Sequence, residues 1–544
     1  MGHVCNINRM SNFPEMSGAD ARSTRLRWGT LAVLSISIIM LNLDNTILNV
    51  ALPTLVRDLH SSSSQLQWIV DSYILVFAGL LLTGGSLGDR LGRKWIFMTG
   101  LAVFGAGSVA SAFSGSSNML IATRAFMGIG GAMAMPSTLS IITNVFIVPR
   151  ERARAIAIWS GSSGLGVALG PIAGGWLLDH YWWGSVFLVN VPVVIVGLIA
   201  AMILVPNSVD PAIAKPDPLG SLLSIGALGT IIWAIIEAPN KGWTSASTLL
   251  AFAIGIILLV SFLVVESKSS HPMLRLKFFE NRRFSVAATS IAIVFFSLMG
   301  ASFLLTQYLQ FVRGYNPLRS GELLLGLAGA LLVFAPLSAI VAHHIGTKIT
   351  VAFGLALAAV GAIFLGRYQT GTSLMAIELP LVLVGIGLAF TMPPSAESVM
   401  GSVPRAQAGV GSATNGTLIQ VGGAMGVAVM GSVLNTAYRS HLVAAHGFSL
   451  LPAPIAGAAK SSLGTALQAA ARLPAVYGSA LANAAKSAFM SGFGTTMWVA
   501  VGTAFAGALI ALIALPARAA ADPDFELSPQ VDSGSSVSGG SVSG

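Results

Sequence analysis

The stretch "GGSLGDRLGRKWIF", residues 84–97, decides how the sequence is interpreted. It places Asp89, Arg90, Arg93 and Lys94 within six positions, between two apolar runs. Only 9% of the 544 residues are charged, 54% are hydrophobic, and the mean hydropathy is +0.79. Soluble domains carry about 25% charged residues. The composition is therefore that of a membrane protein, and the charged stretch is expected to connect two membrane-spanning helices.

Several uncharged runs reach the roughly 20 residues that a helix needs to cross the hydrocarbon layer. These runs and the turns between them predict an all-α membrane protein with fourteen transmembrane helices. We expect the helices near 29–52, 66–88, 95–114, 119–146, 154–178, 185–205, 219–237, 246–265, 284–312, 321–343, 349–367, 374–398, 407–437 and 493–516.

The two ends of the chain have a different composition. Residues 1–27 contain four arginines but no apolar core, so we interpret them as a cytoplasmic tail and not as a cleaved signal peptide. Residues 518–544 are rich in Ser and Gly, and we expect them to be disordered. The single cysteine, Cys5, excludes a disulfide within the chain.

The distribution of Lys and Arg predicts the orientation, because short cytoplasmic loops are enriched in these residues. With both termini inside, the inner segments hold 19 Lys and Arg and the outer segments hold 9, while Arg124 lies within a span. We therefore expect both termini on the cytoplasmic side of the inner membrane. The charged stretch at 84–97 then lies in an inner loop, where the simplest interpretation is an anchor of positive charge.

An internal repeat divides the chain into two halves. Gly92, Lys94, Gly100 and Leu101 match Gly346, Lys348, Gly354 and Leu355 at a constant offset of 254, and weaker matches follow at 255 and 256. Parallel repeats of six spans are typical of transporters that bind their substrate between the halves. The predicted domains are a six-helix bundle at 28–206, two inserted helices at 207–283, and a six-helix bundle at 284–517 with an outer loop at 439–490.

Four motifs in order resemble those of the major facilitator superfamily, and within it the fourteen-helix drug:H⁺ antiporters that export quaternary ammonium compounds and other drugs. They are "LDNTILNVALP" (43–53), the loop motif G-x-L-x-D-R-x-G-R-K from Gly85 to Lys94, "LIATRAFMGIGGA" (120–132) and "GVALGPIAGG" (166–175). The sequence departs from this pattern at 183–185, where "WGS" replaces the usual Trp-Arg-Trp.

The resemblance implies a gating role for the loop motif. Asp89, with Arg90, Arg93 and Lys94, is expected to hold the inner side shut when the cavity faces outward. A carboxylate at this edge can accept hydrogen bonds from the N-terminal amides of a helix across the interface. Gly85 and Gly92 permit the tight turn and the close approach of helices.

The glycine-rich motif in the fifth helix has two interpretations. Gly166, Gly170, Gly174 and Gly175 give the helix a smooth surface, and Pro171 removes one backbone hydrogen bond. The resemblance implies a hinge specific to export, with close packing against the other half. Generic packing of membrane helices through glycine is the alternative.

Charged residues inside the spans are the candidates for function, since burying one charge in hydrocarbon costs at least about 2.5 kcal/mol. Asp44 and Arg124 are expected at similar depth. A carboxylate beside a guanidinium can release its proton when the two approach and regain it when they separate, so the pair is our candidate for proton coupling. A static buried ion pair that only fixes packing is the alternative.

A lipophilic cation is the predicted substrate, because unpaired carboxylates and aromatic faces in a dry cavity attract one. The candidate substrate-binding residues are Asp44, Asp71, Glu397, Tyr73, Gln307 and Phe390. The rival interpretation is an exporter of a lipid, a siderophore or another metabolite on the same scaffold.

No phosphate-binding loop occurs in the sequence, so we expect a proton gradient to supply the energy and no cofactor to be needed. The adjacent His343 and His344 have no acidic neighbour, and we predict no metal site. The protein is predicted to be a transporter and not an enzyme, to contact membrane lipid and no nucleic acid, and to work as a monomer.

Overall fold

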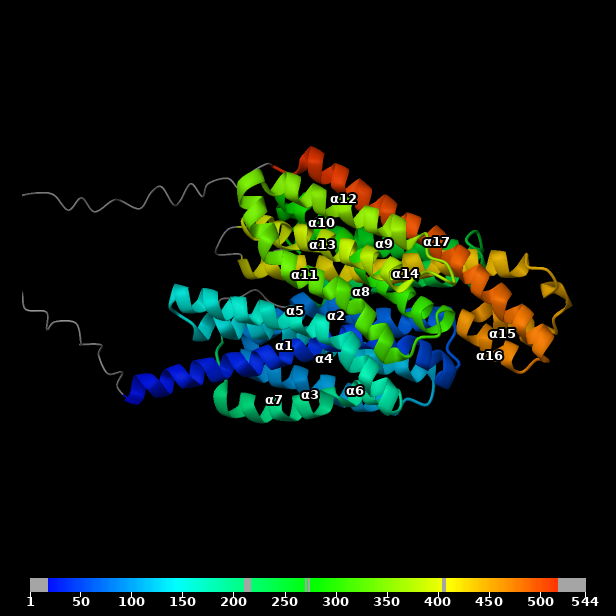
Figure 1. Ribbon diagram of the computed structural model, residues 1–544. Coiled ribbons are helices and arrows are strands. Elements are labelled where there is room, and N and C mark those ends of the chain that lie inside the picture. Colours follow the sequence, from blue (N-terminus) through cyan, green and yellow to red (C-terminus); the bar gives the residue numbers. More distant parts are fainter. Residues whose placement is uncertain (1–17, 210–216, 270–271, 273, 404–407, 517–544) are drawn as a thin grey trace, which may run out of the picture.

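The computed structural model describes residues 18–209, 217–269, 272, 274–403 and 408–516. Within these ranges the regular structure is helical, and fourteen helical segments are long and apolar enough to cross a membrane. The helices run roughly parallel in two lobes (Figure 1). The predicted all-α fold and the predicted number of spans are confirmed for this part of the chain. The disorder predicted for 518–544 and the first 17 residues of the predicted tail lie outside it.

The first lobe contains α1 to α7, and a break at Val189 divides its last span into α6 and α7. Polar residues cap the start of helix α2. Ser62 accepts from the Gln65 amide while the Gln65 side chain accepts from the Ser62 amide, which satisfies two free donors of α2. The bounds are α1 (Gly18–Leu59), α2 (Ser63–Leu91), α3 (Arg93–Ala112), α4 (Ser117–Val145), α5 (Pro149–His180), α6 (Ser185–Leu188) and α7 (Asn190–Leu204).

The rest of the chain forms two inserted helices and the second lobe. Directly after α10, five residues adopt a π-helix, η2, before the chain turns into α11. The bounds are α8 (Pro218–Lys241), α9 (Ala246–Lys268), η1 (Leu276–Glu280), α10 (Arg282–Gln307), η2 (Tyr308–Val312), α11 (Pro317–Ile345), α12 (Thr347–Leu365), α13 (Leu374–Met400), α14 (Ala408–Val443), η4 (Phe448–Leu450), α15 (Ala453–Ser461), α16 (Leu463–Ala471) and α17 (Ala475–Ala514).

The two lobes repeat one arrangement. The main helix pairs of the first lobe, α1 with α5, α2 with α4 and α3 with α4, correspond to α10 with α14, α11 with α13 and α12 with α13 in the second. Gly92 and Gly346, which the sequence repeat aligns, both precede a helix with positive φ, at 112° and 90°. Only glycine adopts such angles without strain. The repeat in the sequence therefore reflects a repeat in the backbone.

The structure differs from the sequence-based prediction at the starts of two helices. Helix α1 begins at Gly18 and thus includes part of the predicted tail, and α17 begins at Ala475, well before the predicted residue 493. Between α14 and α17, the short helices α15 and α16 project from the bundle as a hairpin (Figure 1). Alanine has the highest helix propensity, so this alanine-rich segment continues as helix beyond the apolar spans.

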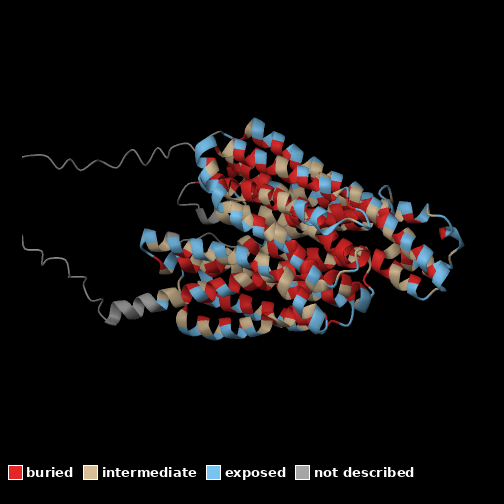
Figure 2. Cartoon of the chain, in the orientation of Figure 1, coloured by how far each residue is buried: buried red, intermediate tan, exposed pale blue. Residues whose placement is uncertain are grey.

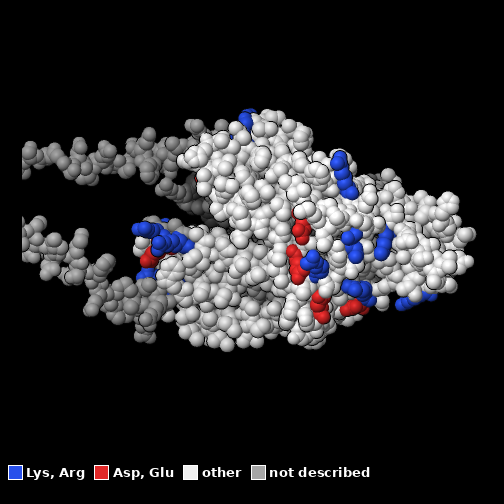
Figure 3. All heavy atoms as spheres, viewed as in Figure 1, with Lys and Arg blue, Asp and Glu red and all other residues white. Residues whose placement is uncertain are grey.

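The bundle has two distinct ends. We call the end where α1 begins and α17 finishes the tail end, and the opposite end, which carries α15 and α16, the hairpin end (Figure 1). Buried residues concentrate between the helices, and exposed ones follow the outer surface (Figure 2). On the visible face of the first lobe, charged side chains gather toward both ends and leave an uncharged band between them (Figure 3). This distribution fits a bilayer around the middle of the bundle.

Contacts between the lobes run mainly through two helix pairs, α2 with α14 and α5 with α11. The inserted helix α8 contacts both α2 and α14 and therefore covers their line of contact from one side. The lobes approach each other closely toward the hairpin end, where a Cβ on Gly175 would lie 2.6 Å from Leu318 Cα. Toward the tail end, large side chains of α5 and α11 such as Leu165 and Leu332 are exposed, and a notch separates the lobes (Figure 3).

The glycine face of α5 provides a test of packing within the first lobe. A Cβ on Gly166 would lie 2.5 Å from the carbonyl oxygen of Ile39, whereas a Cβ on Gly164 would meet nothing within 4 Å. We expect Gly166→Ala to destabilise the purified protein by about 1–3 kcal/mol, because α1 and α5 must move apart. Gly164→Ala is the matched control and should unfold at the parent's temperature. Equal thermal stability of both variants in detergent would contradict this packing.

Candidate functional site

A buried ion pair lies inside the first lobe. Arg124 Nη1 on α4 donates to Asp44 Oδ2 on α1 at 2.5 Å, and the two side chains are 1% and 0% exposed. The prediction that these residues meet at similar depth is confirmed. In a dry environment the attraction offsets the cost of burying both charges only if the remaining hydrogen-bonding atoms also find partners.

Asn190 supplies such a partner to Asp44. Its Nδ2 donates to Asp44 Oδ1 at 2.9 Å and lies 3.3 Å from the Ser108 hydroxyl. Asn190 is the first residue of α7, directly after the break at Val189, and is 1% exposed. Sequence reasoning missed this residue. Its only signal is that it is a single polar side chain inside the apolar run "FLVNVP".

The guanidinium of Arg124 is held by further contacts. Its Nε donates to the carbonyl oxygen of Ile69 at 3.3 Å, and its Cζ lies 4.4 Å from the centre of the Tyr73 ring. The Phe187 ring lies at 5.9 Å on α6. Tyr73, a predicted substrate-binding residue, is therefore packed against Arg124, with 0% exposure in this state.

The other predicted substrate-binding residues lie apart from this cluster. Gln307 bonds to Phe303 within its own helix, and Phe390 packs edge-on against Phe353 with ring centres 5.5 Å apart. Glu397 is exposed in the last turn of α13, at the tail end. Asp71 is fully buried on α2, and neither of its carboxyl oxygens has a hydrogen-bond partner. The structure thus brings Asp44 and Tyr73 together but does not gather all six residues in one pocket.

Gln310 and Gln67 each reach across from one lobe to the other. Gln310 Nε2 donates to the carbonyl oxygen of Val50 on α1 at 2.8 Å, from the π-helix that follows α10. A π-helix adds a residue to the turn and rotates the following side chains. From the other lobe, Gln67 Nε2 lies 3.1 Å from the carbonyl oxygens of both Val427 and Ala428 on α14.

The loop motif forms contacts within its own half. Arg93 Nε donates to Asp89 Oδ1 at 2.6 Å, and Lys94 Nζ donates to the carbonyl oxygen of Met202 at 2.7 Å. Arg90 is exposed, and Gly85 lies in contact distance of Pro136 on α4. The predicted contact of Asp89 with a helix of the other half is not formed with any residue that the structure describes, and the lobes are apart at the tail end in this state.

The glycines of α5 have two different partners. Gly166, Gly170 and Gly174 face α1 of the same lobe, so the predicted packing of these three against the other half is wrong. It is right for Gly175, which meets Leu318 on α11, and a Cβ on Gly321 of α11 would lie 2.2 Å from the Pro171 carbonyl oxygen. The same-lobe contacts follow from the repeat, because Gly422 and Gly426 of α14 face α10 in the same way.

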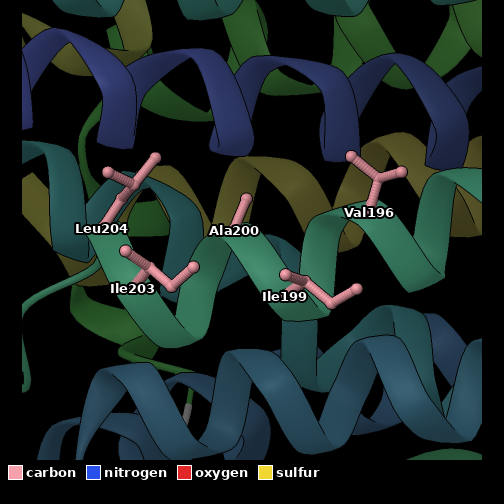
Figure 4. Close-up of a pocket in the computed structure, with 5 residues that line it drawn as sticks. All are labelled: Val196, Ile199, Ala200, Ile203 and Leu204. Carbon is pink, nitrogen blue, oxygen red and sulfur yellow. The ribbon is translucent and has the colours of Figure 1, made fainter.

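A depression on α7 is lined by five aliphatic side chains, Val196, Ile199, Ala200, Ile203 and Leu204 (Figure 4). Three of them, Val196, Ile199 and Ile203, are 59–73% exposed, as expected for residues that face lipid. No group of three or more His, Cys, Asp or Glu side chains that could hold a metal occurs in the part of the chain that the structure describes.

These features define the class of protein. Two equivalent helical lobes meet closely toward one end and stand apart at the other, with an ion pair buried among apolar spans. This is the architecture of a secondary transporter that exposes a central site to one side of the membrane at a time.

Comparison with known proteins identifies the family. The sequence profile of the Major Facilitator Superfamily matches residues 34–427, and the chain belongs to this superfamily. The protein is therefore a transporter and not an enzyme. The fold agrees with two solved structures: a bacterial homologue of the human lysosomal transporter Spinster (TM-score 0.61, 17% identity, 90% of this chain and 98% of that chain) and the peptide transporter POT (TM-score 0.54, 18% identity, 88% and 95%).

Relatives of known function are drug exporters and resistance proteins. The multidrug efflux pump LfrA of Mycolicibacterium smegmatis is 36% identical over 93% of this chain and 99% of its own length. The tetracenomycin C resistance and export protein of Streptomyces glaucescens is 32% identical (89% and 91%). The methyl viologen resistance protein SmvA of Salmonella typhimurium is also 32% identical (85% and 93%). The predicted resemblance to fourteen-helix drug exporters is confirmed.

The burial of the ion pair predicts a specific pattern of stability. Asp44→Asn leaves the Arg124 charge unpaired in an apolar interior and should cost about 3–5 kcal/mol of stability. The double variant Asp44→Asn with Arg124→Gln should recover most of this loss. Thermal unfolding of the purified variants measures the effect.

An exposed pair gives the control for this experiment. Arg319 and Glu322 are bonded at 2.8 Å with side chains 48% and 42% exposed. Glu322→Gln should therefore change the stability by less than about 1 kcal/mol. If the double variant were as unstable as Asp44→Asn alone, the unpaired arginine would not be the cause.

Proposed function

We propose that the protein is a proton-coupled antiporter of the cytoplasmic membrane that exports lipophilic, cationic drugs by alternating access. The Asp44–Arg124 pair carries the proposal, because it is the one ion pair with both side chains essentially unexposed among those that the structure describes. The relatives support the substrate class. One is a multidrug pump, and another confers resistance to methyl viologen, which is an organic dication.

Proton coupling follows from the electrostatics of this pair. Arg124 and Asn190 each donate a hydrogen bond to one of the two carboxyl oxygens of Asp44, so both oxygens act as acceptors in this state. A proton taken up by Asp44 would cancel the attraction and leave the guanidinium with Ile69 and the Tyr73 ring. Protonation is thereby tied to a rearrangement of α1 against α4.

A membrane gradient is strong enough to drive such a cycle. One charge that crosses the membrane field is worth about 2.3 kcal/mol per 100 mV. Export of a monovalent cation against two protons moves one net charge inward. At about 1.4 kcal/mol for each factor of ten, 100 mV then supports a drug gradient of roughly 40-fold, and the pH gradient adds to it. We place the tail end in the cytoplasm, in agreement with the larger number of Lys and Arg residues on that side.

Transport in inverted membrane vesicles tests the function. An imposed proton gradient should drive accumulation of a quaternary ammonium dye such as ethidium by the parent, and a protonophore should abolish it. The variant Asp44→Asn with Arg124→Gln should still bind the dye but should not accumulate it. Accumulation by this variant at the parental rate would exclude the pair as the proton carrier, and transport of lipids or siderophores in place of the dye would favour the rival substrate class.

A second prediction concerns the gate at the tail end. The Asp89–Arg93 pair is part-buried, and we infer that Asp89 stabilises the state in which this end is closed. Asp89→Asn should slow transport roughly tenfold or more, a difference of about 1.4 kcal/mol, while dye binding to the purified protein is retained.

Glu151 offers the matched control, since it also lies at the tail end and is bonded to Arg27 at 3.3 Å with 40% exposure. Glu151→Gln should transport at the parental rate. Parental transport by Asp89→Asn would refute the gating role.

A further inference from the structure

One carboxyl group of the transporter is not used by the proposed mechanism. Asp71 on α2 is 0% exposed, and neither oxygen has a hydrogen-bond partner. Buried polar atoms are nearly always paired, and an unpaired buried carboxylate is far more costly than an unpaired neutral group. The protonated form of Asp71 is therefore the one that this closed environment can hold.

Asp71 lies in the contact between the two lobes. One turn before it, Gln67 donates to the carbonyl oxygens of α14, and one turn after it, Leu75 lies against Gly229 of α8. Side chains four residues apart share one face of a helix. Asp71 thus occupies the face of α2 that packs against α14 and α8, and we call the contact of these three helices the seam.

The elements around the seam offer no cation to Asp71. Helix α14 has no charged residue between Gly411 and Tyr438, and its Arg439 donates to the carbonyl oxygens of Lys460 and Pro239. Helix α8 has none before Glu237, an acid that lies 3.4 Å from Asn240, and its Lys241 lies over the Trp233 ring. Arg124, on α4, is already bonded to Asp44 and to Ile69. No charged group on these elements therefore stabilises an ionised Asp71 while the seam is closed.

The hairpin of α15 and α16 covers the seam at its outer end. The Ser63 hydroxyl donates to the carbonyl oxygen of Ser461, and Gln468 Nε2 lies 3.3 Å from the carbonyl oxygens of Val56 and Arg57. A Cβ on Gly464 would lie 2.5 Å from Val56 of the first lobe and 2.6 Å from Phe311 of the second. The hairpin therefore bridges both lobes at this end.

We propose that Asp71 is a proton-dependent latch at the hairpin end: the seam closes when Asp71 binds a proton and opens when Asp71 ionises into water. An opened seam exposes the carboxyl group to solvent, where an aspartate is ionised at neutral pH. Closing the seam therefore takes up a proton from the hairpin side, and opening it returns the proton to the same side. Unlike Asp44, Asp71 carries no proton across the membrane. It makes the return to the tail-open state depend on the pH outside.

This inference rests on the proposed transport cycle, but its test requires no transport. The single native cysteine is replaced by Cys5→Ser, and spin labels are attached through Gly115→Cys and Gly371→Cys. Both glycines lie in loops at the hairpin end, one in each lobe, with nothing within 4 Å of an added Cβ. Double electron-electron resonance on the full-length protein in nanodiscs then reports the opening of this end as a function of pH.

In the parent, the population with the longer label distance should rise from acid to alkaline pH, by at least roughly tenfold relative to the short-distance population. Asp71→Asn mimics the protonated form, so the short distance should dominate at every pH. Asp58→Asn is the control, because Asp58 is an exposed acid at the same end, and it should respond as the parent does. A pH response in Asp71→Asn equal to that of the parent would overturn the latch, as would a parent without any response.

The vesicle assay separates this result from the proposed function. If the latch is right, Asp71→Asn slows dye accumulation and weakens the dependence of its rate on pH on the hairpin side to the part due to Asp44, while the number of protons exchanged per dye is unchanged. A changed proton-to-dye ratio would show that Asp71 carries a proton across the membrane and would overturn the latch. Failure of the parent to couple dye movement to protons would refute the proposed function, whatever the label distances show.

Discussion

The hydrocarbon interior supplies no water to polar groups, and the structure of this transporter depends on that constraint. Every charge inside the spans must find a partner, change its protonation state or reach an end of the bundle. Asp44 and Arg124 take the first solution, with Asn190 and a backbone carbonyl completing the set. Asp71 has no hydrogen-bond partner, so its solution is a change of protonation state. Glu397 reaches the tail end of the bundle, where it is exposed. These three solutions give the three acids different roles.

The constraint also explains why the fold could be predicted from the sequence. Apolar runs of sufficient length have no stable alternative to helices in a membrane, so composition and spacing define the spans. The repeat was detectable because the residues that the two halves share are required by the local backbone conformation or by close helix contacts. Gly92 and Gly346 adopt positive φ, and Gly166 and Gly422 face a carbonyl oxygen of the neighbouring helix. Such positions tolerate few substitutions, so the two halves still match there.

The arrangement of the site was predicted less completely, because it depends on contacts between distant segments. Asn190 is one polar residue in an apolar run, and nothing in its local sequence indicates that it faces Asp44. Gln307 bonds within its own helix, whereas Gln310, in the π-helix, reaches across to α1. Asp71 was predicted as a counter-charge for the substrate, but its place between α2, α14 and α8 is a property of the packed lobes.

The contacts that close the hairpin end are suited to repeated opening. Gln67 and Gln310 donate from opposite lobes to backbone carbonyl oxygens, and the carbonyl oxygen of each amide side chain has no partner. Water can replace such hydrogen bonds at a net cost of only about 0.5–1.5 kcal/mol each. These bonds fix the register of the lobes without locking them. The free energy that decides between the open and the closed seam must then come from a group whose charge changes, and among the residues of α2 that face the seam Asp71 is the one that ionises.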